Sequence, residues 1–278
     1  AFGAAAASAV WLPIDALLWR SAAAYAVATA VVFGFSFGLK NSSMYDAYWS
    51  VGPPALFAWW AWVGELTPRG WIVGGLVALW GIRLTYNCLR GFTHLGHEDW
   101  RYRDLQAQFG PLYWGISLLG IHFFPTVLTY TGSLSMLVVL GGGAAPLGWL
   151  DGVAAAVTLL GIAYEAIADE QLRAYRRSGP PPGDWLRTGL WRHSRHPNYF
   201  GEVTFWWGLY LFAVAAAPGV WWAVIGPALI TLLFFFISIP LIDRRMVARR
   251  PGYAAYSRRV SRMVPWFIRP AQPEPSGR

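Results

Sequence analysis

The sequence predicts an all-α, polytopic membrane protein with about seven transmembrane helices and ordered cytoplasmic loops. Of its 278 residues 56% are hydrophobic and only 13% are charged, a composition far from that of an average soluble domain. Apolar stretches of about 20 residues, the length that crosses the hydrocarbon core of a bilayer, recur along the chain. We expect a single transmembrane domain over residues 1–270, followed by a disordered, proline-rich tail over residues 271–278.

The arginines orient these helices in the membrane. They gather in residues 170–198 and 244–269, whereas residues 140–147 and 215–220 carry no charge. Because basic loops stay on the cytoplasmic side, we expect the first two segments inside, the last two outside and the N-terminus outside. The expected spans lie near residues 16–39, 46–64, 71–90, 112–139, 148–168, 199–216 and 219–242.

The net charge of +8 raises the question of a nucleic-acid partner. Basic residues beside apolar spans are better explained by topology and anionic lipid, so we expect membrane lipids and no nucleic acid among the partners. The single cysteine, Cys88, excludes an internal disulfide. Residues 1–10 lack the basic segment of a signal peptide and the sequence begins without methionine, so we expect a trimmed or engineered terminus.

The second span opens with Tyr45 and Asp46, which lie within one helical turn of Trp49. An aspartate at a helix start is either a functional carboxylate or an ordinary cap that complements the helix dipole. Glu65 follows at the outer end of this span, where we interpret it as a surface carboxylate. Further along, His122 is expected either to bond a neighbouring carbonyl or to line a site.

The third span and the loop after it carry a second group of polar residues. Arg83 and Asn87 are four residues apart and therefore share a helix face. In the loop, charged side chains alternate with aromatic ones, so we expect an ordered segment that covers a ligand. Its candidate residues are Glu98, Asp99, Arg101 and Tyr102. His94 and His97 lack a third ligand at metal-binding spacing, and we predict no metal site.

The fifth span ends with Glu165, Asp169 and Arg173 at successive i, i+4 positions. The carboxylates are general acids, salt-bridge partners or acceptors for a ribose or an amide, with salt bridges the default among so many arginines. Near the C-terminus, Tyr253 and Tyr256 either pack over a ligand or anchor a basic segment at the membrane interface.

The chain is organised around residues 189–208, GLWRHSRHPNYFGEVTFWWG. Pro197 is expected at the first helical position, where its missing N–H costs nothing. The free N–H groups of such a helix start, together with the helix dipole, favour an anion. Arginines at this place also serve simply as membrane anchors. The polar side chains around the helix start are Arg192, Arg195, His196, Asn198, Tyr199 and Glu202.

Seven strings occur in order over nearly the whole chain: KNSSMYDAYW, WGIRL, HEDWRY, EAIADEQL, TGLWRHSRHPNYFGE, PLIDRR and PGYAAYSRRVSRMVPW. In this series the sequence resembles bacterial membrane proteins of the steroid 5-alpha-reductase family. The element RHPNYFGE alone also resembles that of isoprenylcysteine-type membrane methyltransferases, which bind S-adenosylmethionine there.

The family resemblance implies an inner-membrane enzyme that binds NADPH from the cytoplasm and reduces the carbon–carbon double bond of an enone in a lipid-like substrate, a 3-oxo-Δ4-steroid for example. Animal members place a Gln-Glu pair and a tyrosine at the carbonyl. Here GELTP offers Glu65 without the glutamine. The first candidate catalytic pair is therefore Asp46 with Tyr45, and the second is Glu65 with Tyr86.

The cofactor-binding candidates are the polar and aromatic side chains at the cytoplasmic ends of the expected spans. They are Arg83, Asn87, Glu98, Asp99, Arg101, Tyr102, Glu165, Asp169, Arg173, Arg192, Arg195, His196, Asn198, Tyr199, Glu202, Tyr253 and Tyr256. Two alternatives stay open: a methyltransferase that uses S-adenosylmethionine, and a non-enzymatic lipid-binding protein whose arginines grip anionic headgroups.

Overall fold

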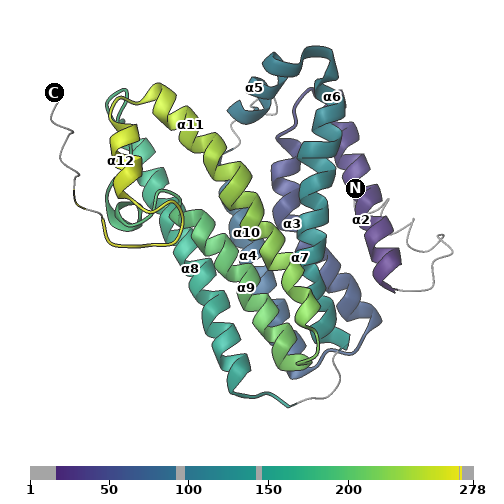
Figure 1. Cartoon of the computed structure of the whole chain (residues 1–278). Helices are drawn as coiled ribbons and strands as arrows, with labels where there is room; N and C mark the ends of the chain where they lie inside the picture. The colour runs from purple at the N-terminus through teal and green to yellow at the C-terminus, as the bar shows by residue number, and fades with distance from the viewer. Residues whose placement is uncertain (1–16, 92–97, 142–145, 269, 271–278) are drawn as a thin grey trace. The chain divides into compact units, whose positions relative to one another are not determined.

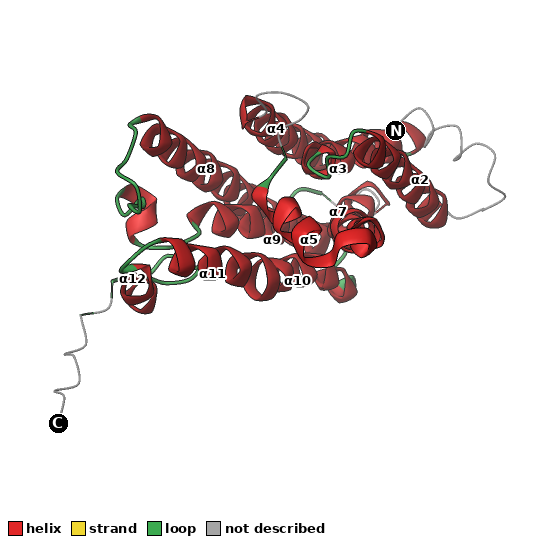
Figure 2. Cartoon of the chain, turned by 90° about the horizontal axis from the view of Figure 1, so that it is seen from above, coloured by secondary structure: helices red, strands yellow, loops and turns green. Residues whose placement is uncertain are grey.

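The computed structural model describes residues 17–91, 98–141, 146–268 and 270 (Figure 1). These residues form helices joined by loops and contain no strand, as Figure 2 shows. One isolated parallel bridge joins Ser194 to Ser261. The all-α prediction is thus confirmed for the described part of the chain, and the expected tail at 271–278 lies outside it.

Five helical segments among the described residues are long and apolar enough to cross a membrane, as expected of an integral membrane protein. They are Leu17–Gly38, Pro68–Gly91, Trp100–Gly141, Trp149–Arg177 and Trp221–Arg249. The two other expected spans also form helices, α3 (Met44–Val63) and α9 (Pro197–Ala216), but neither belongs to these five. The count of seven spans therefore stays a prediction.

The chain divides into two compact units. Unit 1 comprises Ala1–Gly152 and Leu209–Gly226, and unit 2 comprises Val153–Gly208 and Pro227–Arg278. Each unit is described by itself, and the single transmembrane domain expected over residues 1–270 stays a prediction.

Unit 1 is built around α3, which contacts α2 (Leu17–Gly38), α4 (Pro68–Gly91) and α7 (Phe124–Gly141). The contact of α3 with α4 is close at Gly81, where an added Cβ would lie 2.5 Å from the Pro54 side chain and 2.8 Å from the Ser50 carbonyl oxygen. At the start of α4, Arg69 forms a buried ion pair with Asp151, with Nε 2.6 Å from Oδ1.

A helical run precedes α7 in unit 1. It comprises α5 (Trp100–Phe109), η1 (Gly110–Leu112), α6 (Tyr113–Ile116) and η2 (Ser117–Phe123). The last of these is a π-helix, a form that is rare and often found at functional sites. It carries His122, which the wider turn places inside the unit.

In unit 2, the first part of α9, up to Gly208, lies between α8 (Trp149–Arg177) and α11 (Ile239–Arg249) (Figure 2). Glycines allow the close approach of α8 and α9, because small residues let helix backbones touch. A Cβ on Gly201 would lie 2.6 Å from the Glu165 backbone nitrogen, and one on Gly161 would lie 2.5 Å from that of Phe205. The other elements of unit 2 are η3 (Gly189–Arg192), the π-helix η5 (Leu233–Ser238) and α12 (Tyr253–Arg259). Of the two that remain, η4 (Trp221–Val224) belongs to unit 1, and α10 (Ile225–Leu232) begins in unit 1 and continues in unit 2.

Candidate functional site

The helix start predicted at Pro197 is confirmed, since α9 begins at this residue. The loop before it is fastened to α8: Gln171 Oε1 accepts from the Leu190 backbone N–H at 2.9 Å, and Trp191 Nε1 donates to the Ala168 carbonyl at 3.0 Å. Gly189 has φ +59°, and a Cβ there would lie 2.5 Å from Gln171 Oε1, so only glycine suits this turn.

The C-terminal segment holds the other side of the same loop. The Arg195 backbone N–H donates to the Ser261 carbonyl at 2.9 Å, and the Trp266 N–H donates to the His193 carbonyl at 3.0 Å. Ser194 Oγ donates to the Met263 carbonyl at 2.6 Å. Residues 193–196 are therefore fixed in place before α9 begins.

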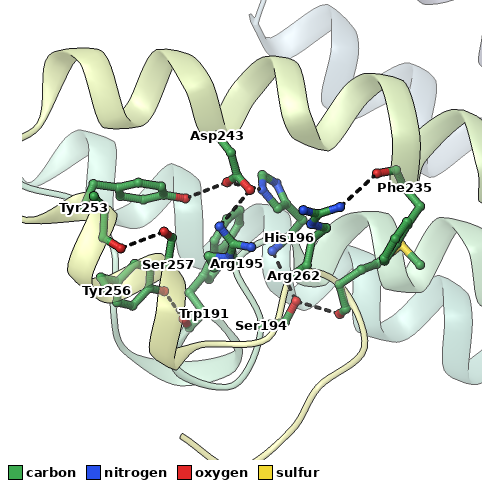
Figure 3. A network of polar contacts seen from close by, with 12 residues as sticks. Trp191, Ser194, Arg195, His196, Phe235, Asp243, Tyr253, Tyr256, Ser257 and Arg262 are labelled. Atoms are coloured by element: carbon green, nitrogen blue, oxygen red, sulfur yellow. Dashed lines mark hydrogen bonds and ion pairs between the residues drawn. The ribbon is translucent and has the colours of Figure 1, made fainter. Parts of the chain in front are cut away.

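Asp243, on α11, lies at the centre of the polar contacts (Figure 3). Its carboxylate accepts from Arg195 Nη1 at 2.7 Å, from His196 Nε2 at 3.1 Å and from the Tyr253 hydroxyl at 3.1 Å. Because a carboxylate only accepts, His196 carries its proton on Nε2 in this contact. Burial lowers the pKa of His196, and the hydrogen bond to Asp243 acts in the opposite direction. We call Asp243, Arg195, His196 and Tyr253 the aspartate cluster.

The structure gives the two predicted phosphate-binding arginines different surroundings. Arg195 has only 8% of its side chain exposed and is ion-paired with Asp243, so its charge is compensated within the chain. Arg192 lies at the end of η3 and is exposed.

Carboxylates from α8 and α9 lie near the start of α9. Glu165 and Glu202 are buried, and Glu202 Oε1 accepts from Trp206 Nε1 at 3.0 Å. Asp169 Oδ1 accepts from the Asn198 amide at 3.3 Å. The predicted group on α8 is thus brought next to the predicted group on α9.

The remaining predicted side chains of unit 2 pack around this core. The Tyr199 ring stacks on that of His196 with centroids 5.6 Å apart and lies 4.5 Å from that of Phe234 in η5. Arg173 Nε lies 3.8 Å from Glu170 Oε1.

Tyr253 and Tyr256 stabilise the loop before α9. Both rings pack against Trp185, with centroids 5.5 and 5.6 Å away. The Tyr256 hydroxyl donates to the Trp191 carbonyl at 2.9 Å, and burial raises its pKa to about 12, which keeps it a donor at neutral pH. A contact of either tyrosine with a ligand or the membrane stays a prediction.

In unit 1 the structure separates the first candidate catalytic pair. The Tyr45 side chain is buried and its hydroxyl lies 2.9 Å from Thr126 Oγ1. Asp46 instead accepts from the Tyr102 hydroxyl at 2.6 Å, and its Oδ1 lies 3.8 Å from Arg101 Nη2. Adjacent residues of a helix point in different directions, which explains why the two side chains have different partners.

Tyr45 belongs to a set of buried hydroxyl groups that we call the hydroxyl cluster. Thr29 Oγ1 lies 3.0 Å from Thr126 Oγ1, and Thr29 also donates to the Tyr48 hydroxyl at 3.4 Å. The Tyr25 hydroxyl lies 3.2 Å from Thr129 Oγ1. The members of the cluster are Tyr25, Thr29, Tyr45, Tyr48, Thr126 and Thr129, all of them buried.

His122 adjoins this cluster. Its ring centroid lies 5.2 Å from that of Tyr45. Nδ1 contacts the Ser117 carbonyl at 2.9 Å, so the interpretation of His122 as bonded to a neighbouring carbonyl is confirmed. A carbonyl only accepts, which places a proton on Nδ1 and leaves Nε2 of the neutral ring to accept from Ser36 Oγ at 2.9 Å.

The predicted loop residues fold onto the start of α3. Glu98 is buried and accepts from the Ser42 N–H at 2.9 Å. Asp99 is the N-cap of α5 and accepts from the backbone N–H and the guanidinium of Arg101. This part of the loop is ordered, as expected, whereas His94 and His97 lie outside the described residues. No group of three possible metal ligands occurs in the described ranges.

The second candidate catalytic pair is not brought together. Glu65 is exposed just before α4, and Tyr86, 59% exposed, lies 18 residues after the first residue of that helix. At 1.5 Å per residue this separates Tyr86 from the helix start by about 27 Å. Arg83 and Asn87 lie half-buried on the same helix.

Two features of these sites were missed in the sequence. Asp243 stands in the string PLIDRR, and a carboxylate among the arginines that follow a span was the available signal. The hydroxyl cluster is distributed over α2, α3 and α7, so its members come together only in the folded unit.

Comparison with known proteins places the chain in a family. No solved structure matches it. An uncharacterized protein of Schizosaccharomyces pombe is 29% identical over an alignment that covers 84% of this chain and 76% of the yeast protein. The family described as "Protein of unknown function (DUF1295)" matches residues 32–260, a range that includes Tyr45, the helix start at Pro197 and Asp243. Because the match covers most of the sequence, the chain belongs to this family.

Proposed function

We propose that the protein is a membrane reductase that uses NADPH to reduce the carbon–carbon double bond of an enone in a lipid-like substrate, such as a 3-oxo-Δ4-steroid. The observation that carries this proposal is the convergence in unit 2 of polar groups from three separate segments. They come from α8 with Glu165 and Asp169, from the start of α9 with His196 and Asn198, and from α11 with Asp243. These segments belong to three of the sequence strings that carry the family resemblance, EAIADEQL, TGLWRHSRHPNYFGE and PLIDRR, or lie next to them. A common cofactor site requires that such segments lie close together in the fold.

The side chains at this place fit a cofactor with ribose hydroxyls, an amide and phosphates. Carboxylates such as Asp169 accept hydrogen bonds from hydroxyls, and the Asn198 amide both donates and accepts. The exposed guanidinium of Arg192 is suited to a phosphate, because its planar donors match phosphate oxygens. NADPH supplies a hydride when it is bound.

The chain must also stabilise negative charge on the enone oxygen. The hydroxyl cluster of unit 1 supplies neutral donors in a buried setting, where a hydrogen bond to a developing oxyanion is worth more than in water. Within it Tyr45 is the best candidate, since the Tyr45 hydroxyl contacts another hydroxyl rather than a charge. Asp46 is engaged with Tyr102 and Arg101, which supports its interpretation as a structural carboxylate at the start of α3.

One alternative enzyme has a specific observation in its favour. The element RHPNYFGE, which resembles that of the methyltransferases, forms the start of α9. Hydrogen bonds to α8 and to the C-terminal segment hold the loop in front of it in place. A methyltransferase would bind S-adenosylmethionine at this helix start. The lipid-binding interpretation predicts affinity for neither cofactor.

Ligand-induced stabilisation separates these functions. The detergent-solubilised protein is heated with NADPH, with S-adenosylmethionine or with neither, and a ligand that binds the folded state raises its melting temperature. We expect stabilisation by NADPH, and consumption of NADPH when progesterone is added. Stabilisation by S-adenosylmethionine alone would replace the reductase with the methyltransferase.

We further propose that the chain crosses a bacterial inner membrane seven times. The ends of α8 and α9 that carry the arginines then lie on the cytoplasmic side. The arginine distribution supports this orientation. Ser178 is exposed just after α8. A Ser178→Cys variant made together with Cys88→Ser should be protected from an impermeant thiol reagent in intact cells and labelled after lysis. Labelling from outside would reverse the topology.

A further inference from the structure

A cavity in unit 2 is lined by Arg195, by residues of α12 and by the segment after α12. Its volume is about 380 Å³, and its polar lining consists of Arg195, Arg258, Arg259, Arg262, Ser257 and Ser261. Among the residues that the structure describes, four arginines and no carboxylate line it. Because Asp243 compensates the charge of Arg195, the positive charge of the cavity comes from Arg258 and Arg259 in α12 and from Arg262 after it.

The cavity has a fixed shape. Its wall is held by the hydrogen bond from the Arg195 N–H to the Ser261 carbonyl and by that from the Trp266 N–H to the His193 carbonyl. The Arg262 guanidinium lies 4.9 Å from the Phe235 ring centroid, a cation–π contact that fixes its direction. Figure 3 shows Arg262 and Arg195 beside Ser194, where the two segments meet.

One buried donor at this cavity has no acceptor. Arg195 is only 9% exposed, and its Nη1 is paired with Asp243. Its Nε, however, makes no hydrogen bond to any residue that the structure describes. A buried N–H without a partner is unfavourable, so an anion bound beside Arg195 would stabilise its guanidinium group. Phosphate is the anion that several guanidinium groups bind best, because paired N–H donors match its oxygens.

The apolar part of the cavity wall indicates where that phosphate comes from. Trp266 and Phe267 line the cavity and yet are 65% and 79% exposed, and the nearby Val264 is 53% exposed. Arginine next to exposed aromatic side chains is typical of the membrane–water interface, where basic residues attract anionic headgroups. A dissolved phosphate ion gains nothing from such a rim.

We propose that this cavity binds the phosphate headgroup of an anionic phospholipid while Trp266 and Phe267 insert into the same lipid surface. This lipid site shares Arg195 with the proposed NADPH site, but the rest of its lining comes from α12 and the segment after it rather than from α8 and the first turns of α9.

The test uses the 278-residue chain in a neutral detergent. Short-chain phosphatidylglycerol and phosphatidylcholine are titrated separately, and binding is followed by the rise in melting temperature. We expect phosphatidylglycerol to bind and phosphatidylcholine, with no net charge, to have little effect. Arg258→Gln should weaken phosphatidylglycerol binding about fivefold. Arg249→Gln removes an equally exposed charge that does not line the cavity, and it should change the affinity less than twofold. Equal losses would replace the cavity with diffuse electrostatic attraction.

Further variants identify the ligand. Arg258→Lys keeps the charge but loses the paired donors, so we expect an affinity between those of wild type and Arg258→Gln. Trp266→Ala should weaken phosphatidylglycerol binding. Inorganic phosphate binding as tightly as the lipid, with no effect of Trp266→Ala, would make the cavity a site for dissolved phosphate. Competition between NADPH and phosphatidylglycerol, with both weakened by Arg258→Gln, would assign the cavity to the dinucleotide. Either result overturns the lipid site, and neither depends on reductase activity.

Discussion

The hydroxyl cluster of unit 1 and the aspartate cluster of unit 2 bury polar groups in opposite ways. Thr126 Oγ1 contacts Tyr45 and Thr29 and also donates to the His122 carbonyl, so it keeps partners when one is lost. Asp243 carries the charge that compensates Arg195 and accepts from His196 and Tyr253 as well. A neutral network therefore tolerates the loss of one member, whereas a charged one depends on its counter-ion.

The largest effect is expected at Asp243. The Asp243→Asn variant removes the negative charge and leaves Arg195, which is almost fully buried, without compensation. Removing one partner of a buried pair costs about 3–5 kcal/mol, and we expect unfolding free energy to fall by that amount in a denaturant titration of the solubilised protein.

A matched control and a double variant test the reason for this loss. Asp184→Asn weakens the more exposed pair with Arg187 and should lower the unfolding free energy by no more than about 1 kcal/mol. Arg195→Gln combined with Asp243→Asn should be more stable than Asp243→Asn alone, because no buried charge remains. A double variant as unstable as the sum of its parts would show that the ion pair is not the source of the effect.

The next largest effect concerns turnover. If Tyr45 stabilises the enone oxygen, Tyr45→Phe should lower the rate of enone reduction by about 10²–10³-fold. Its unfolding free energy should fall by only about 0.5–1.5 kcal/mol, since one hydrogen bond of a neutral network is lost. NADPH affinity should stay close to that of wild type, because the loss falls on the transition state.

Substitutions of the other candidate acids complete this test. Asn keeps an oxygen that accepts from Tyr102, and no cap is lost because the N-cap of α3 is Ser43, so Asp46→Asn should turn over normally. Glu65→Gln and Tyr86→Phe should do so too, because both side chains are exposed and lie far apart along α4. Normal turnover of Tyr45→Phe with an inactive Glu65→Gln would reverse the choice of acid.

The fold and part of the site could be predicted from the sequence. Apolar length predicted the helices, and the restricted backbone of Pro197 predicted where α9 begins, because both signals are local. The partners of the polar residues could not be predicted in this way. Arg195 is close to Arg192 in sequence, yet it contacts Asp243, 48 residues away, while Arg192 is exposed. Tyr45 and Asp46 are neighbours whose directions differ because helix geometry separates them.

A binding measurement comes third in size. Arg192→Ala should weaken NADPH binding roughly ten- to a hundredfold, since a charge-assisted contact to phosphate is worth about 1.5–3 kcal/mol. Arg262→Ala should leave NADPH affinity nearly unchanged, because Arg262 packs on Phe235 and lines the cavity of the proposed lipid site. Titration of NADPH into both variants checks this. Arg195→Ala is predicted to weaken binding too, but it also leaves Asp243 unpaired and therefore mixes the two effects.

The smallest effect is a pH dependence that distinguishes the two clusters. Burial lowers the pKa of His196 in the folded protein, the contact with Asp243 opposes this, and the charges of Arg195 and Arg262 lower the pKa further, so that it lies below its usual value. In the unfolded chain the pKa of a histidine is about 6.5. As the pH falls below that value the unfolded chain binds a proton that the folded chain does not, so stability should decrease from pH 7 toward pH 5. Above pH 7 the ring is neutral in both states and contributes no pH dependence.

The His196→Gln variant removes the titrating group and keeps an N–H donor for Asp243, so its stability should change less between pH 7 and pH 5 than that of wild type. His193→Gln replaces an exposed neighbour and should retain the pH dependence of wild type. Tyr45→Phe should retain it as well, since the hydroxyl cluster contains no group that titrates between pH 5 and 7. If His196→Gln and wild type lost stability in parallel, the pH dependence would originate elsewhere in the chain.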